Sequence, residues 1–107
     1  MIFPQRGEIY LVRFDPTVGH EIQKTRPAVV LFEEFGNVVI AGVTSNLKMK
    51  GIPLTKSEGA IKDSVIKLNY IFTISNEMVF KVILHLSKEK KRLIFEGLGK
   101  RLDGLKT

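Results

Sequence analysis

The sequence contains no cysteine, and only two of its 107 residues are histidine. The lack of cysteine excludes disulfides and thiolate metal sites. His20 and His85 are 65 residues apart, a poor start for a zinc site, and we expect neither a metal nor a cofactor. No apolar run approaches the ~20 residues that a membrane helix needs. The N-terminus, MIFPQRGE, lacks the apolar segment of a signal peptide. These absences predict a cytoplasmic protein with no membrane partner.

Negative charge is also scarce. Lys and Arg number 17 against 11 Asp and Glu, so the net charge is +6 and the pI is about 9.7. This excess suits a polyanionic partner such as a nucleic acid. Charge that only keeps the protein soluble would give the same balance, so composition leaves both readings open.

The apolar residues are arranged mainly as short β-strands. We expect strands at residues 8–14, 28–32, 38–43, 64–68, 70–74 and 78–84, with a bend near Asn69. Residues 52–55 contain Pro53 and can form only a short or edge strand. After Ser87, a candidate N-cap, residues 88–102 carry apolar side chains at helical spacing: Leu93, Ile94, Leu98 and Leu102. Pattern alone predicts one domain over residues 1–107, a small barrel of five to seven mostly antiparallel strands with a C-terminal amphipathic helix.

A long connection separates the first two predicted strands. Residues 15–27 read DPTVGHEIQKTRP, which is far longer than the ~2–5 residues of a common hairpin loop. Pro16 and Pro27 restrict its two ends, and Pro27 holds Arg26 in extended geometry where the second strand begins. Loops of this length are often functional. We therefore expect Arg26 to occupy a defined position on a rigid edge.

Three segments resemble the opening of the MazF/PemK toxins, the ribonuclease components of bacterial toxin–antitoxin pairs. They are residues 6–12 (RGEIYLV), 15–21 (DPTVGHE) and 25–30 (TRPAVV), and a weaker match continues to the helix. The resemblance implies an SH3-like barrel that forms a homodimer. It also implies the toxin of a type II toxin–antitoxin system, a metal-independent, sequence-selective endoribonuclease acting on single-stranded mRNA. The implied partners are a cognate antitoxin and, through the antitoxin complex, operator DNA.

The resemblance assigns catalytic roles to four residues. Metal-free cleavage uses the 2′-hydroxyl as the nucleophile and leaves cyclic phosphate and 5′-hydroxyl ends. Arg26, a permanently charged fork matched to phosphate, is expected to stabilise the transition state; the alternative is an ion pair with a surface carboxylate. Thr44, at a strand end, is expected to hold a phosphate oxygen. His20 is the acid–base candidate at neutral pH, and Glu21 is a second base or orients Arg26.

Residues around these four are expected to bind RNA. The expected set is Gln23, Lys24, Ser45, Asn46, Lys48, Lys50, Lys67 and Asn69. Three positions depart from the family pattern. Lys67 and Asn69 stand where some members carry Arg and Asp, and Phe72 stands where Arg is common. Because Asn cannot act as a base, the version of the mechanism that uses an Asp at position 69 is closed to this chain.

These departures keep other hypotheses open. The second hypothesis is an SH3-like barrel that binds nucleic acid or its antitoxin without cutting. A third is a ribosome- or DNA-associated barrel unrelated to toxins. Binding that weakens steeply with salt but yields no RNA fragments would distinguish the second hypothesis from the first.

Overall fold

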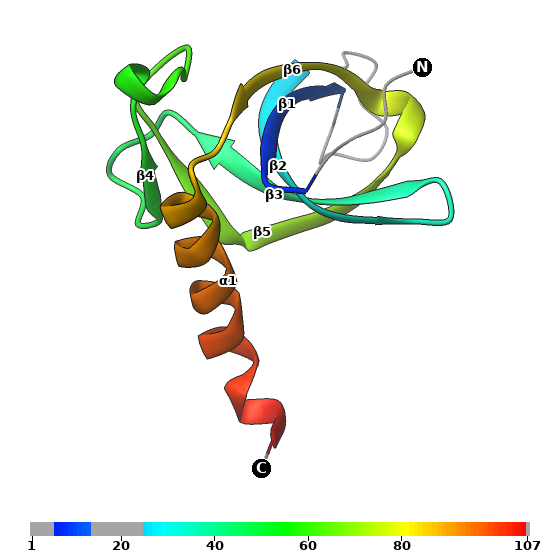
Figure 1. The fold of residues 1–107 in the computed structure, drawn as a ribbon, viewed down its shortest axis with the longest axis vertical. Helices are drawn as coiled ribbons and strands as arrows, with labels where there is room; N and C mark the ends of the chain where they lie inside the picture. Colours follow the sequence, from blue (N-terminus) through cyan, green and yellow to red (C-terminus); the bar gives the residue numbers. More distant parts are fainter. Residues whose placement is uncertain (1–5, 14–24, 107) are drawn as a thin grey trace.

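The computed structural model describes residues 6–13 and 25–106, with the side chains of residues 11–13 left aside. In this part of the chain six strands form one antiparallel sheet in the order β4–β5–β3–β2–β1–β6. The strands are β1 (Glu8–Arg13), β2 (Thr25–Glu34), β3 (Asn37–Thr44), β4 (Ile52–Leu54), β5 (Ser64–Ser75) and β6 (Val79–His85). The sheet curls into a partly open barrel, and helix α1 (Lys88–Leu102) leaves it at one end (Figure 1). The predicted mainly β fold with a C-terminal helix is confirmed.

Two strands differ from the prediction. Strand β2 begins at Thr25 and not at residue 28, so Arg26 and Pro27 lie within it and pair with Val12 and Leu11 of β1. Strand β5 is one strand of 12 residues, of which the predicted strands 64–68 and 70–74 are the two halves. The predicted irregularity near Asn69 is confirmed, because the pairing with β3 slips between Lys67 and Ile71. The predicted edge strand is β4.

The core lies on both faces of β2 and β3. Alternate residues of a strand point to opposite faces. On one face Val29 and Ala41 pack in a cluster with Ile66, and on the other Val30 and Ile40 pack in a second cluster. All five residues are 1% exposed or less. Burial on both faces fixes the pairing of β2 with β3, since a slip by one residue would exchange the two sets.

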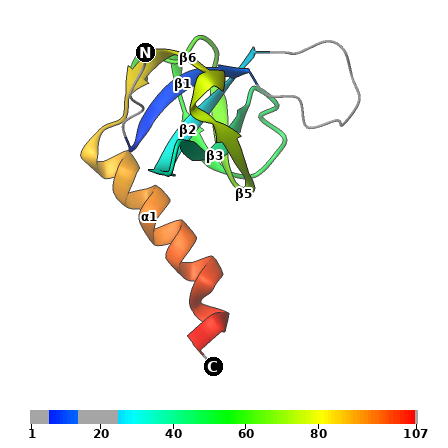
Figure 2. The ribbon, with the colours of Figure 1, turned by 90° about the vertical axis from the view of Figure 1, so that its right-hand side faces the viewer.

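Helix α1 packs on the barrel only through its first turns. The Ser87 hydroxyl accepts a hydrogen bond from the Lys90 N–H at 3.1 Å, which confirms the predicted N-cap. Ile94 is buried, whereas Leu93 and Leu102 are 40% and 57% exposed. The predicted apolar face is therefore covered only in part, because the helix continues away from the sheet (Figures 1 and 2).

Three short 3-10 helices complete the described part: η1 (Lys56–Glu58), η2 (Asn76–Met78) and η3 (Asp103–Lys106). The first interrupts the predicted loop 56–62, and the third continues from α1. None of the described helices has both the length and the apolar character needed to cross a membrane.

Candidate nucleic-acid site

Arg26 and Thr44 lie together where β2 begins and β3 ends. The pairing of the two strands ends at Ala28 and Gly42, and Arg26 and Thr44 each lie two residues beyond that pair. Both residues also line the same two pockets. The structure therefore brings together two of the four predicted catalytic residues.

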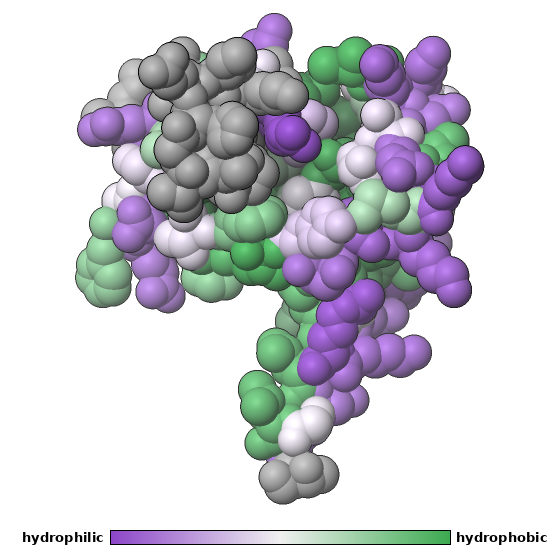
Figure 3. Space-filling view, turned by 180° about the vertical axis from the view of Figure 1, so that it is seen from behind, coloured by the Kyte–Doolittle hydropathy of each residue, from purple (hydrophilic) through white to green (hydrophobic). Residues whose placement is uncertain are grey.

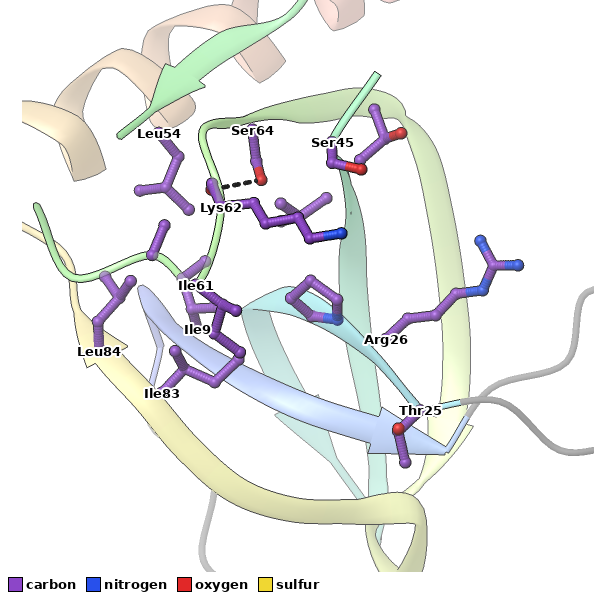
Figure 4. Close-up of a pocket in the computed structure, with 14 residues that line it drawn as sticks. Ile9, Thr25, Arg26, Ser45, Leu54, Ile61, Lys62, Ser64, Ile83 and Leu84 are labelled. Carbon is purple, nitrogen blue, oxygen red and sulfur yellow. Dashed lines mark hydrogen bonds between the residues drawn. The ribbon is translucent and has the colours of Figure 1, made fainter. Parts of the chain in front are cut away.

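The first pocket, here called the Lys62 pocket, has a volume of about 340 Å³. Arg26, Thr44 and Ser45 line one side, and the loop between β4 and β5 supplies Ile61 and Lys62 on the other. Figure 4 shows the Lys62 side chain reaching into the pocket, with its amine on the side where Arg26 lies. Apolar side chains of β1, β4 and β6 form the floor: Ile9, Leu54, Ile83 and Leu84.

The loop that carries Lys62 is held in place at several points. The Ser64 hydroxyl donates to the Lys62 carbonyl at 2.8 Å (Figure 4). Both the N–H and the hydroxyl of Thr55 donate to Glu58 Oε1 at 3.0 Å. Lys90, from the first turn of α1, lies 3.3 Å from Glu58 Oε2. Partial burial of Glu58 acts to raise its pKa, but the hydrogen bonds from Thr55 and the charge of Lys90 outweigh it and lower the pKa below 4.5.

The second pocket, here called the Tyr70 pocket, has a volume of about 420 Å³ and lies on the other side of the Arg26–Thr44 pair. It shares four residues with the first pocket: Arg26, Pro27, Val43 and Thr44. Its other walls include Met49, Tyr70 and Phe72. The Arg26–Thr44 pair is thus the boundary between two concave surfaces.

The structure separates the predicted RNA-binding residues into groups. Ser45 lines the Lys62 pocket, and Lys67 lies over the ring of Tyr70. The Asn46 side chain accepts from the Lys48 N–H at 3.1 Å, a local turn that bounds the end of β3. Five of the predicted residues in the described part of the chain line neither pocket: Asn46, Lys48, Lys50, Lys67 and Asn69. Their RNA contacts stay predictions.

Another group of predicted residues falls in the segment between β1 and β2. His20, Glu21, Gln23 and Lys24 lie outside the described residues. Their expected roles stay predictions as well.

Two residues that line the pockets were not expected from the sequence. Lys62 lies in a polar stretch that reads as a surface loop, and Tyr70 sits in a strand that reads as part of the core. Both residues reach the site through contacts between segments that are distant in sequence, Lys62 from the loop before β5 and Tyr70 from β5 itself. A signal for Tyr70 existed in its spacing from Phe72, because residues two apart on a strand share a face.

The site can hold a phosphate between fixed donors. The Thr44 hydroxyl accepts from the Asn46 N–H at 3.2 Å and still carries a proton to donate. Within the described part of the chain, no carboxylate forms an ion pair with Arg26, so its guanidinium is available to an anion. The described residues that line the two pockets include Arg26 and Lys62 but no His, Asp or Glu. The described lining residues therefore supply charge stabilisation, and no general base is among them.

Comparison with protein families gives a match over most of the chain. Residues 5–102 match the family described as PemK-like, MazF-like toxin of type II toxin–antitoxin systems. The chain is 30% identical over 104 residues to Endoribonuclease EndoA of Bacillus subtilis (strain 168), an alignment that covers 88% of this chain and 90% of that protein.

Solved structures share the fold. The toxin MazF-mt6 of Mycobacterium tuberculosis superposes with a TM-score of 0.74 at 21% identity, covering 90% of this chain and 96% of that one. A MazE–MazF structure from Deinococcus radiodurans gives 0.75 at 20% identity, covering 94% and 96%. At this identity the likeness concerns the fold alone, and it supports the barrel described above.

The contacts of Glu58 predict a pH dependence of stability. A carboxylate with a lowered pKa stabilises the folded state above its unfolded pKa, and this contribution is lost as the pH falls through the folded value. Glu58→Gln keeps an oxygen for Thr55 but removes the charge near Lys90. We expect the variant to lose about 0.5–1 kcal/mol of unfolding free energy at pH 7, and the difference to vanish as the pH falls below 4.5. Urea unfolding at pH 7 and at a pH below 4.5 measures the difference in unfolding free energy between Glu58→Gln and the wild type. An equal difference at the two pH values would contradict the prediction.

Proposed function

This chain belongs to the PemK-like, MazF-like toxin family of type II toxin–antitoxin systems, and we propose that it is a metal-independent endoribonuclease acting on single-stranded RNA in the cytoplasm. The observation that carries the proposal is the placing of Arg26 beside Thr44 on two paired strands, at the boundary of two pockets. The name of the B. subtilis relative, an endoribonuclease, supports the same activity. Family membership argues against the third hypothesis, a ribosome- or DNA-associated barrel unrelated to toxins.

The reaction follows from the groups available. The 2′-oxygen of one nucleotide attacks the adjacent phosphorus, a base takes its proton, and the P–O5′ bond breaks as the 5′-oxygen gains a proton. The products are a 2′,3′-cyclic phosphate and a 5′-hydroxyl. Negative charge grows on the phosphorane oxygens, so fixed donors aimed at them lower the barrier. Arg26 supplies a bidentate fork, and Thr44 supplies a hydroxyl. His20 and Glu21 are the proposed groups for proton transfer.

Lys62 extends this arrangement to a neighbouring phosphate. Its ammonium enters the pocket from the loop opposite Arg26 (Figure 4). Lysine acts as a compact point charge and not as a bidentate fork. We therefore assign it to RNA affinity, while Arg26 acts on the reacting phosphate.

A second function, binding without cleavage, has one observation in its favour. The described residues lining the two pockets hold no His, Asp or Glu that could serve as a base. Cleavage then depends on His20 or Glu21. If neither acts, the same surface would bind RNA and leave it intact.

A second copy of the chain and an antitoxin are the proposed protein partners. One side of the projecting helix is apolar and the other is charged (Figure 3). Phe95 and Leu102 of α1 are 77% and 57% exposed, and Leu105 of η3 is 82% exposed. Exposed apolar surface of this kind marks an interface. We expect light scattering to give the mass of two copies, and a larger complex with an acidic partner encoded beside this chain. A stable monomer would contradict the homodimer.

Arg26→Ala tests the enzyme directly. We expect cleavage of a long mixed-sequence RNA in EDTA to fall about 10²–10³-fold, because one donor to the developing charge is lost. Arg92→Ala is the matched control, since Arg92 is an exposed helix arginine near Glu96 and should leave the rate unchanged. Sequencing gels of the fragments should give 5′-hydroxyl ends, and an all-deoxy oligonucleotide should stay intact. Full activity in Arg26→Ala would refute the mechanism, and intact RNA with wild-type protein would favour binding alone.

Lys62→Ala tests the affinity role. One lost phosphate contact should reduce the slope of log K against log salt by about 0.7 for single-stranded RNA. Lys56→Ala removes the same charge from the same loop, but Lys56 lines neither pocket, so its slope should match the wild type. Fluorescence anisotropy over a salt series measures both. Equal slopes for Lys62→Ala and the wild type would exclude a phosphate contact.

A further inference from the structure

The Tyr70 pocket is more apolar than a phosphate site requires. Besides Arg26 and Thr44, it is lined by Met49, Tyr70 and Phe72. Its floor comes from β2 and β3, through Ala28, Ile40 and Gly42. At about 420 Å³ it falls in the ~300–1,000 Å³ range of ligand pockets. The first site needs only cations and a hydroxyl, so this pocket calls for an explanation of its own.

An irregularity in β5 places Tyr70 at the pocket. Gly42 pairs with Lys67, and the next β3 residue, Ala41, pairs with Ile71, so three residues of β5 have no partner in the β3 register. Tyr70 is the last of these and is 39% exposed. A Cβ at Gly42 would lie 3.4 Å from the Tyr70 Cβ, so the absence of a side chain at Gly42 lets the tyrosine lie close over β3.

Lys67 holds the tyrosine ring. Its ammonium lies 5.3 Å from the ring centroid and donates to the Lys50 carbonyl at 2.6 Å. A cation over a ring is attracted by the π-face. A ring fixed in this way loses less conformational freedom when a flat ligand packs against it. Two of the ammonium's three protons stay available to an anion beside the ring.

We propose that Tyr70 and Phe72 form a stacking platform for one nucleobase of the bound RNA, a proposal that rests on the RNA-binding function above. The phosphate of that nucleotide lies at Arg26 and Thr44, which belong to the same pocket. Aromatic side chains stack on any base, and positive charge beside them holds the backbone. RNA strands on proteins are read largely in this splayed form. The platform would therefore hold the base on this side of the cut in a fixed, splayed position whatever its identity.

The charge of the pocket favours RNA over an apolar protein segment as its occupant. Arg26 lines it and Lys67 stands at its tyrosine, while none of the described lining residues is acidic. An apolar peptide side chain would use the apolar walls but not the fixed donors at the boundary. A nucleotide uses both at once.

The test uses a 2′-O-methyl oligonucleotide of mixed sequence, which binds but cannot be cut. Tyr70→Leu keeps an apolar side chain without the ring, and we expect its Kd to rise about tenfold, the loss of one stacked base. Tyr70→Phe keeps the ring and should retain wild-type affinity. Phe35→Leu is the control, because Phe35 is a fully exposed aromatic residue in the β2–β3 turn, and should change nothing. Circular dichroism confirms that each variant is folded.

Abasic substitution along the oligonucleotide identifies the stacked base. One position should weaken binding to the wild type about tenfold and leave Tyr70→Leu without a further loss. Wild-type affinity in Tyr70→Leu, or equal losses in both proteins at every position, would overturn the platform. The platform would also be overturned if Tyr70→Leu no longer bound the antitoxin but bound RNA with wild-type affinity.

Cleavage of the all-ribose strand, measured in parallel, separates this proposal from the enzyme. Binding that depends on Tyr70 without cleavage would overturn the enzyme and leave the platform standing. Cleavage without dependence of binding on Tyr70 would overturn the platform alone.

Discussion

The pairing of β2 with β3 is the constraint on which the site depends. Val29, Val30, Ile40 and Ala41 are buried on alternating faces of this pair, so a slip of one residue would exchange the two buried sets between the faces. Arg26 and Thr44 lie two residues beyond the last pair of this register, Ala28 and Gly42, and line the same two pockets. The pairing that packs the core therefore also fixes the geometry of the site. Substitutions at the centre of β2 or β3 should change the geometry of the phosphate site.

The two ends of helix α1 have different roles. Its first turn supplies Lys90, which lies against Glu58 and so holds the loop that carries Lys62. Gly97 then lets the helix approach β5, since a Cβ there would lie 2.5 Å from Leu68 Cδ1. Beyond Leu98, which is partly buried against the core, the helix leaves the sheet (Figure 2), and Leu102 is 57% exposed. One element thus braces the pocket and presents a surface to a partner.

The local sequence pattern predicted which strands and helix form better than it predicted where they begin and end. The strands around Ile9 and Ile40, the edge strand at Pro53 and the cap at Ser87 follow from residue type and spacing. The early start of β2 did not, because Pro27 reads as a boundary, whereas a proline at a strand's beginning loses little of the ladder.

The candidate site was predicted in part. Arg26, Thr44 and Ser45 follow from strand ends and the resemblance. Lys62 depends on hydrogen bonds and an ion pair that fold its loop over the pocket, and Tyr70 depends on a slip of three residues between β3 and β5. Neither can be read from hydrophobic periodicity, because each is a tertiary relation between segments far apart in sequence. At position 72, where the resemblance leads us to expect an arginine, this chain has Phe72, which lines the Tyr70 pocket together with Tyr70. Positive charge is supplied by Lys62 in the Lys62 pocket and by Lys67 over the ring of Tyr70. In the proposed complex the two lysines attract the RNA backbone, while a base occupies the space beside the phosphate held by Arg26 and Thr44. Phe72 then adds a contact to the base and leaves the donors to the phosphate unchanged.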